Sequence, residues 1–219
     1  MNGTDLPEQR SPITLPGRVV VFDYGEVISL EPSLENRRAL LHIAGVPAAD
    51  ADAFWSAYWS PRAELDRCGI SIREYWRSVG DAIGRSFGDE LVHQLWLTDF
   101  TGWLSINPGT ATVLEDLAAG GTRLALLSNA GPDYSSFFRS GSLGPLFEQA
   151  FVSGELGLIK PDPAIYRHAL EALGIEPHAM VFIDNKAENV ESAQALGITG
   201  HVFTTPAELR AFLTALAAE

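Results

Sequence analysis

Five short apolar runs occur along the chain, and in its second half they alternate with segments whose apolar residues recur at helical spacing. The runs are Val19–Phe22, Arg123–Leu127, Gln149–Val152, Met180–Ile183 and Gly200–Phe203. The helical patterns cover Thr110–Ala118, Pro163–Leu173, Ala187–Leu196 and Pro206–Ala217. Strands that alternate with helices predict an α/β fold, in which helices cover both faces of a parallel sheet.

The segment from Pro32 to Trp103 interrupts this alternation. It is rich in Ala, Leu, Trp and Arg at helical spacing and shows no convincing strand pattern, so we expect three to five helices packed as a small bundle. Candidate helix N-caps are Ser33, Asp50 and Ser71. The bundle is therefore predicted to be an insertion, residues 32–103, into an α/β domain made of residues 17–31 and 104–219.

Length and charge narrow the possible classes of protein. The chain has 219 residues, enough for one large domain or two small ones, and its net charge of −13 argues against a nucleic-acid or anionic-membrane partner. No apolar run approaches the roughly 20 residues of a membrane span, and the single Cys68 cannot form an internal disulfide, so a cytoplasmic location is expected. Residues 1–16 are polar, lack the apolar stretch of a secretory signal, and are expected to be a flexible leader.

Polar residues follow four of the apolar runs, where a parallel sheet presents the carboxyl ends of its strands to a ligand. Asp23 follows the first run, and the later positions are Ser128, Asn129, Lys160 and Asp184. Each residue alone is also typical of a turn, a helix cap or a solvated loop. Their shared position after strands of one sheet predicts a single cleft.

These residue types suit phosphoryl transfer. A carboxylate such as Asp23 can attack phosphorus and form an aspartyl phosphate, which divides hydrolysis into two easier steps. Because a carboxylate repels a phosphate dianion, a hard cation such as Mg²⁺ is expected, held by Asp23, Asp184 and the carbonyl of Gly25. Ser128, Asn129 and Lys160 are expected to bind the substrate, and Ser128 and Lys160 would hold its phosphoryl oxygens.

The four motifs together resemble the haloacid dehalogenase-like hydrolase superfamily over nearly the whole chain after the leader. The matching stretches are FDYGEV, LLSNA, IKPDP and FIDNKAEN. The resemblance implies a Rossmann-like sheet domain with an inserted helical cap. It also implies that Asp23 is the nucleophile, that Asp23, Gly25 and Asp184 bind Mg²⁺, and that Ser128 and Lys160 bind phosphate. The stretch LDRCGISIREYW is similar to the cap of the subgroup that includes glucose-1-phosphate phosphatase.

The chain departs from the family pattern at Gly25. Phosphatases of this superfamily usually carry a second Asp two positions after the nucleophile, as general acid and base, although the same subgroup shows an Asp-x-Gly pattern. Removing a general acid typically costs about 10²–10⁴-fold in rate, and the cost is smallest for leaving groups that need no proton. Good leaving groups such as sugar 1-phosphates are therefore expected to be favoured. Glu26 is adjacent, but as the next residue it is expected to point elsewhere.

The insertion supplies further candidates. Six aromatic residues of the insertion are expected to be mostly core, because helical bundles bury such side chains: Trp55, Tyr58, Trp59, Tyr75, Trp76 and Trp96. Arg62 and Arg67 are expected on a solvated surface. The alternative is that they face the cleft and hold an anionic or hydroxylated substrate.

Three classes of function remain open. The favoured one is a Mg²⁺-dependent phosphatase whose partner is a small phosphorylated substrate. The second is a metal-independent 2-haloacid dehalogenase in which Asp23 attacks carbon; Asn129 suits that chemistry, whereas Asp184, without a cation beside it, would repel a haloacid. The third is a non-catalytic binding protein that has kept the fold, for which Gly25 is the main support.

Overall fold

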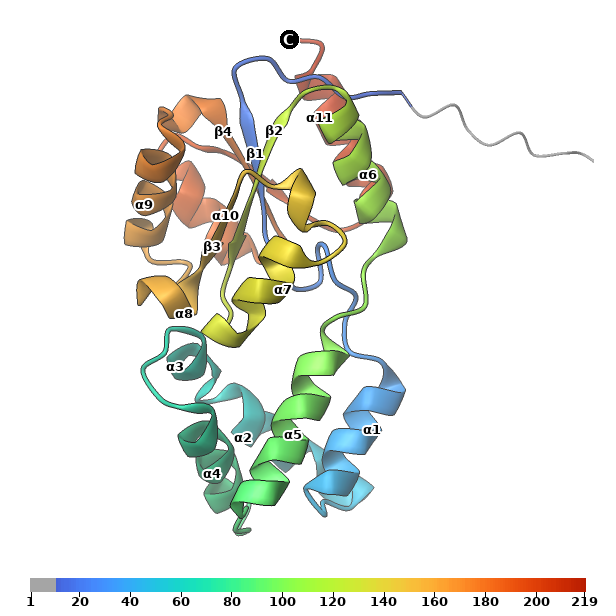
Figure 1. Ribbon diagram of the computed structural model, residues 1–219, viewed down its shortest axis with the longest axis vertical. Coiled ribbons are helices and arrows are strands. Elements are labelled where there is room, and N and C mark those ends of the chain that lie inside the picture. The colour runs from blue at the N-terminus through green and yellow to red at the C-terminus, as the bar shows by residue number, and fades with distance from the viewer. Residues whose placement is uncertain (1–10) are drawn as a thin grey trace, which may run out of the picture.

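The computed structural model describes residues 11–219 and contains a five-stranded parallel sheet (Figure 1). The strand order is β3-β2-β1-β4-β5, and all four pairings are parallel. The strands are β1 (Val19–Phe22), β2 (Arg123–Ser128), β3 (Gln149–Val152), β4 (Met180–Asp184) and β5 (Thr199–Val202). The predicted α/β class and parallel sheet are confirmed, and no strand end differs from the expected one by more than one residue.

Helices cover both faces of the sheet. The first face packs against α6 (Pro108–Ala119), α7 (Ser135–Ser140) and α11 (Pro206–Leu216), and the second against α9 (Pro163–Leu173) and α10 (Ala187–Gln194). The short helix α8 (Ser153–Leu156) follows β3. Single 3₁₀ turns complete the fold: η1 (Ala48–Asp50), η2 (Pro132–Tyr134), η3 (Gly144–Leu146) and η4 (Pro177–Ala179).

The central strand β1 shows why an unbroken apolar run forms a strand here. All four of its side chains are fully buried. Val20 and Phe22 pack into the core on the first face, and Val19 and Val21 into the core on the second. Successive side chains of a strand point to opposite faces, so a sheet covered on both sides needs apolar residues at every position.

Residues 11–16 differ from the flexible leader expected for residues 1–16, of which residues 1–10 lie outside the described residues. Ile13 and Leu15 are buried in the first-face core. The Thr122 hydroxyl donates a hydrogen bond to the Ile13 carbonyl (2.9 Å) and accepts one from the Leu15 N–H (3.0 Å). These two apolar side chains and their backbone bonds fix the segment against the sheet domain.

Every regular element between residues 34 and 102 is a helix. The five α-helices are α1 (Leu34–Ile43), α2 (Ala51–Trp59), α3 (Arg62–Asp66), α4 (Ile72–Ala82) and α5 (Asp89–Gly102). They enclose a separate apolar core, in which Phe54, Tyr75 and Leu95 are fully buried. Ser33 and Ser71 cap α1 and α4 through their side chains, whereas Asp50 precedes α2 without a side-chain capping bond.

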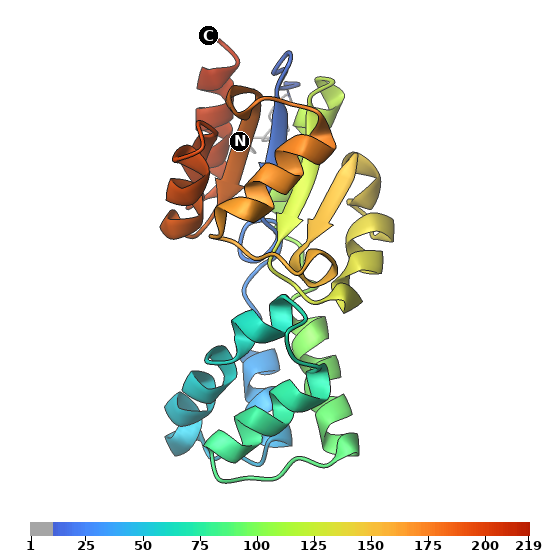
Figure 2. The same ribbon diagram turned by 90° about the vertical axis from the view of Figure 1, so that its left-hand side faces the viewer.

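Two neighbouring chain segments join this helical insertion to the sheet domain. Ser29 and Ile106 form an antiparallel bridge, and the Leu30 N–H donates to the Ser105 carbonyl at 2.7 Å. Figure 2 shows the strands of the sheet ending towards the insertion. The carboxyl ends of the strands therefore face the helices of the insertion. Within residues 11–219, no helix has both the length and the apolar character needed to cross a membrane.

Candidate active site

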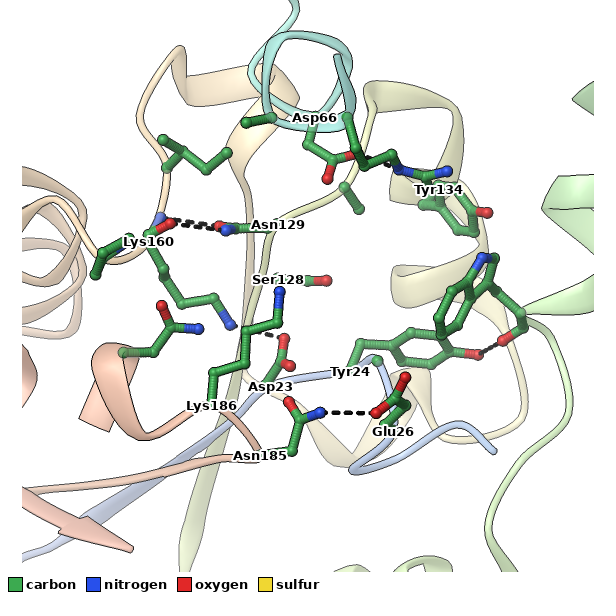
Figure 3. Close-up of a pocket in the computed structure, with 18 of the residues that line it drawn as sticks. Asp23, Tyr24, Glu26, Asp66, Ser128, Asn129, Tyr134, Lys160, Asn185 and Lys186 are labelled. Carbon is green, nitrogen blue, oxygen red and sulfur yellow. Dashed lines mark hydrogen bonds and ion pairs between the residues drawn. The ribbon is translucent and has the colours of Figure 1, made fainter. Parts of the chain in front are cut away.

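A pocket of about 370 Å³ lies at the carboxyl ends of the strands and is lined by both parts of the chain. The sheet domain contributes residues that follow β1, β2 and β4, and the insertion contributes residues from the end of α2 and from α3. The predicted site residues that line this pocket are Asp23, Gly25, Ser128, Asn129 and Lys160 (Figure 3). The structure thus brings these residues together around one pocket, as the strand-end pattern predicts.

Asp23, Lys160 and Asp184 form what we call the strand-end cluster. Asp23 follows β1 and Asp184 ends β4, and these strands are neighbours in the sheet, so the register places the two carboxylates side by side. The Lys160 Nζ atom lies between them, 2.7 Å from Asp23 Oδ1 and 2.7 Å from Asp184 Oδ2. It also donates to the Leu127 carbonyl at 2.9 Å. All three side chains are buried, which makes their mutual pairing necessary.

The two carboxylates of the cluster carry more negative charge than the single Lys160 cation can neutralise. Burial raises the pKa of Asp23 to about 6; the Lys160 cation opposes this shift and the charge of Asp184 adds to it. For Lys160, burial favours the neutral form, but the two carboxylates outweigh burial and raise its pKa above the ordinary value. Lys160 therefore stays charged, and the pair of carboxylates would be stabilised by further positive charge.

The donor set fits Mg²⁺. Mg²⁺ is usually held by one or two carboxylates together with water and substrate phosphate oxygens. Among residues 11–219 there is no group of three or more His, Cys, Asp or Glu side chains that could hold a metal ion. A cation at this site would therefore depend on the two carboxylates, on backbone oxygen such as that of Gly25, and on ligands from outside the chain.

Ser128 and Asn129 are neighbours in sequence but make different contacts in the structure. Ser128 ends β2, is buried, and lines the pocket beside Asp23. The Asn129 amide makes two bonds to the backbone of Lys160: its Nδ2 donates to the Lys160 carbonyl and its Oδ1 accepts from the Lys160 N–H, both at 2.9 Å. In this structure the Asn129 amide positions the backbone of Lys160. Asn129 also lines the pocket, and its contact with the substrate stays a prediction.

Two further residues around Asp184 are functional candidates that the sequence reasoning missed. The Asn189 side chain donates to Asp184 Oδ2 at 2.9 Å and so orients this carboxylate. The Lys186 side chain points into the pocket towards Ser128 (Figure 3). Both lie in the FIDNKAEN stretch directly after a strand, and their position in that motif is the signal that could have found them.

Ser153, which follows β3, is a third missed residue. Its hydroxyl accepts a hydrogen bond from the Ala130 N–H at 2.9 Å and donates to the Asp66 carbonyl at 2.6 Å. Ser153 is fully buried. It therefore ties the loop after β2 to the helical insertion, directly beside the pocket.

Neither Gly25 nor Glu26 offers a free acid beside Asp23. The Glu26 carboxylate accepts a hydrogen bond from Asn185 Nδ2 at 3.0 Å, as Figure 3 shows. A Cβ atom built on Gly25 would meet only the ring of Trp103, at 3.9 Å, which is ordinary contact distance. A Cβ atom at position 25 thus has room.

Arg62 belongs to a second buried network, which we call the insertion cluster: Tyr58, Arg62, Asp66 and Asp99. Arg62 Nε donates to Asp66 Oδ1 at 3.0 Å, and Arg62 Nη1 donates to Asp99 Oδ2 at 2.9 Å and to the Tyr58 hydroxyl at 2.7 Å. The expectation of a solvated Arg62 is wrong, because it lines the pocket and its side chain is only 13% exposed. Arg67 does lie at the surface, paired with Glu64.

Aromatic side chains make up much of the remaining lining. The residues are Tyr24, Trp59, Trp103, Tyr134 and Phe138. Most aromatic residues of the insertion are buried or half-buried, as predicted, but Trp59 is 51% exposed and faces the pocket. Trp59 and Trp103 meet edge to face with their ring centroids 6.5 Å apart.

Comparisons with known proteins agree with the observed fold. The model of the haloacid dehalogenase-like hydrolases matches residues 18–197. A sesquiterpene phosphatase of Aspergillus oryzae is 25% identical over 84% of this chain and 88% of its own. An (S)-2-haloacid dehalogenase of Pseudomonas sp. is 26% identical over 83% of this chain and 82% of its own.

The same fold occurs in solved structures. One is a haloacid dehalogenase family enzyme from Bacteroides thetaiotaomicron in complex with magnesium and inorganic phosphate. It has a TM-score of 0.65 and 18% identity, and the match covers 85% of this chain and 94% of that one. With a family model that spans most of its length, the chain belongs to the haloacid dehalogenase-like hydrolase family.

Proposed function

We propose that this protein is a Mg²⁺-dependent phosphatase that hydrolyses small phosphate monoesters through an aspartyl phosphate at Asp23. The observation that carries the proposal is the strand-end cluster, in which two buried carboxylates converge on Lys160 at the floor of the pocket. The sesquiterpene phosphatase relative and the magnesium and phosphate complex of the Bacteroides enzyme support the same reaction class.

In the proposed reaction, a carboxylate oxygen of Asp23 attacks phosphorus, and the bond from phosphorus to the ester oxygen breaks. The departing alkoxide or phenoxide takes its proton from water. A second water then attacks phosphorus, which breaks the acyl phosphate bond, releases inorganic phosphate and restores Asp23. Lys160 and Ser128 would hold the phosphoryl oxygens, and Asn129 and Asn189 would position Lys160 and Asp184.

Asp23, Asp184 and the Gly25 carbonyl would hold Mg²⁺, which would neutralise charge on the carboxylates and on the phosphoryl group. The raised pKa of Asp23 supports this assignment, since burial and the neighbouring Asp184 leave that carboxylate short of positive charge. Lys160 remains beside both carboxylates and would share in offsetting the charge of the transition state.

Because position 25 carries no acid and Glu26 is engaged by Asn185, the leaving group departs without a dedicated proton donor. Rates should then depend steeply on the pKa of the leaving group. Acyl, aryl and anomeric phosphates are the favoured classes. The similarity of Leu65–Trp76 to the subgroup that includes glucose-1-phosphate phosphatase is the reason to include sugar 1-phosphates among the anomeric substrates.

A metal-independent 2-haloacid dehalogenase is the second candidate, because a relative of that name matches most of the chain. The structure also weakens the argument from sequence against it: Asp184 has a cation, Lys160, at 2.7 Å and would repel a haloacid less than an unpaired carboxylate. The Asn129 amide, which suits the dehalogenase chemistry, is already hydrogen-bonded through both Nδ2 and Oδ1 to the backbone of Lys160. This pairing counts against the dehalogenase candidate.

Phosphate release from a panel of acyl, aryl and sugar phosphates, measured with Mg²⁺ and with excess EDTA, separates the candidates. We expect release with Mg²⁺, loss with EDTA, and restoration when Mg²⁺ is added back. Full activity in EDTA would overturn the phosphatase proposal, and halide release from 2-haloacids under that condition would favour the dehalogenase. Turnover of neither substrate class with Mg²⁺ present would favour a binding protein.

A further inference from the structure

The part of the pocket away from Lys160 is aromatic and rigid. Figure 3 shows Tyr24 and Tyr134 on one side of Asp23, opposite Lys160. The Tyr24 hydroxyl donates to the Trp103 carbonyl at 3.0 Å, so this wall is fixed by a hydrogen bond between the sheet domain and the end of the insertion. A wall of this kind buries the apolar faces of a ligand at little cost in side-chain entropy.

Two polar atoms in this aromatic wall have no hydrogen-bond partner among the described residues: Trp103 Nε1 and the Tyr134 hydroxyl. Both residues line the pocket, and Tyr134 is only 6% exposed. Buried donors without partners are rare in native structures and cost free energy unless a ligand or water satisfies them. Both groups are uncharged, so they add no positive charge to this side of the pocket.

The insertion offers no free positive charge to a substrate. Arg62 is held between Asp66 and Asp99, so its guanidinium is already paired with two carboxylates. Asp66 itself lines the pocket. A second anionic group on the substrate would thus meet a carboxylate on this side, with no unpaired cation to receive it.

The remaining cations of the pocket lie at its phosphoryl end. Among the described lining residues the cations are Arg62, Lys160 and Lys186. Lys160 bridges the catalytic carboxylates, and Lys186 points towards Ser128 (Figure 3). Among the described lining residues, unpaired positive charge is therefore concentrated where the phosphoryl group would bind, whereas Arg62 near Tyr134 is already paired with two carboxylates.

We infer that, among these favoured classes of leaving group, the pocket prefers phosphate monoesters whose alcohol part is uncharged and apolar, with a planar or aromatic group that packs against Trp59 and Trp103. This inference rests on the proposed phosphatase function and deepens it by naming the substrate class. Esters that carry a second phosphate or a carboxylate are the disfavoured class.

The charge part of the inference is tested with two aryl phosphates of equal leaving-group pKa, one with a neutral substituent and one with a carboxylate. We expect kcat/KM to be roughly fivefold or more higher for the neutral ester, since one like charge in a partly buried site costs about 1 kcal/mol. Asp66→Asn should reduce this ratio, because it removes the nearest negative charge and preserves the shape of the side chain. Equal rates for the two esters, or faster hydrolysis of the carboxylated one, would overturn the inference and leave the phosphatase function standing.

The aromatic part is tested with Trp59→Ala. It should raise KM for aryl phosphates roughly tenfold with little change in kcat, because the lost contact acts on binding and not on the reacting atoms. Leu97→Ala is the matched control, since Leu97 is 46% exposed on the same insertion and does not line the pocket. An unchanged KM in Trp59→Ala would contradict the assignment of this wall.

Calorimetry with non-hydrolysable aryl phosphonates gives a readout that needs no turnover. The neutral phosphonate should bind more tightly than the carboxylated one, in the presence of Mg²⁺, and Trp59→Ala should weaken its binding. If the phosphonates follow this order while no ester is hydrolysed, the phosphatase proposal fails and the specificity of the pocket stands. Binding that ignores both the charge and Trp59 overturns the inference.

Discussion

Two clusters contribute residues to the same pocket, and each places one cation between two carboxylates. In the strand-end cluster, Lys160 lies between Asp23 and Asp184, which come from separate strands held side by side by the sheet. In the insertion cluster, Arg62 takes the corresponding place, and one of its partners is Asp66, one turn further along the same helix. The ionic composition is the same, so composition alone does not separate a reactive cluster from a structural one.

The difference lies in what remains for a ligand. The Arg62 guanidinium donates hydrogen bonds to two carboxylates and to the Tyr58 hydroxyl, and it lies over the Tyr58 ring at 5.4 Å. All these interactions lie within the insertion cluster. Asp23 faces the pocket beside Ser128 and has a pKa raised by burial, so it would be stabilised by added positive charge. One cluster fixes the insertion, whereas the other, under the proposed function, would hold a metal ion and a phosphoryl group.

Matched Asp→Asn substitutions in the two clusters give the largest expected contrast. Asp23→Asn should lower kcat for an aryl phosphate by about 10³-fold or more, because it removes the attacking carboxylate. Asp66→Asn, the same chemical change in the insertion cluster, should alter kcat for a neutral aryl ester by less than about tenfold. Steady-state kinetics with circular dichroism as a check on folding measures both. Equal losses in the two variants would contradict the division into a reactive and a structural cluster.

Gly25→Asp tests the missing acid and should have an intermediate effect. The rate for alkyl phosphates relative to aryl phosphates should rise roughly 10- to 100-fold, which is at or below the lower end of what a positioned acid contributes. A Cβ atom at this position has room, because only the Trp103 ring, at 3.9 Å, lies near it.

Gly25→Asn is the control for this experiment, since it adds a side chain of similar size without a carboxylic acid. Parallel Brønsted plots of the wild type, Gly25→Asp and Gly25→Asn against leaving-group pKa separate the contributions of the acid and of the added volume. The account of Gly25 fails if alkyl and aryl phosphates already turn over at similar rates in the wild type.

The smallest expected effect is a pH dependence of stability from Asp66. Burial raises the pKa of Asp66 to about 6, against the opposing charge of Arg62. Since its ordinary pKa is 3.8, the folded state holds the proton more tightly than the unfolded state. Its contribution to stability is thus fully present below pH 3.8 and is lost as the pH rises through about 6.

Urea unfolding of the wild type and of Asp66→Asn between pH 4 and pH 7 measures this contribution. The free energy of unfolding of the wild type, relative to the variant, should decrease as the pH rises. A difference that increases with pH would mean that the ion pair with Arg62 dominates and holds Asp66 in its charged form.

The α/β class and the sheet followed from the sequence because their signals are local. Each buried strand is a continuous apolar run, and Asp23 and Asp184 sit at the ends of two such runs, so parallel geometry alone brings them together. The helices of the insertion and two of their caps, Ser33 and Ser71, were predicted for the same reason.

What the sequence did not predict depends on contacts between distant segments. The buried state of Arg62 requires Asp99, which approaches it only when α3 and α5 pack together. Residues 11–16 are ordered by Thr122, more than 100 positions away along the chain. The orientation of Asn129 likewise depends on the backbone of Lys160, which a local pattern of polar residues does not specify.

The central claim is that Asp23 becomes covalently phosphorylated. The most direct measurement mixes the protein with Mg²⁺ and a ³²P-labelled aryl phosphate, quenches in acid within the first turnover, and maps the label by peptide mass spectrometry. We predict label on the peptide that contains Asp23, sensitive to hydroxylamine and absent from Asp23→Asn. Steady release of phosphate with no label on the protein at any quench time, or label on a different residue, would contradict the account.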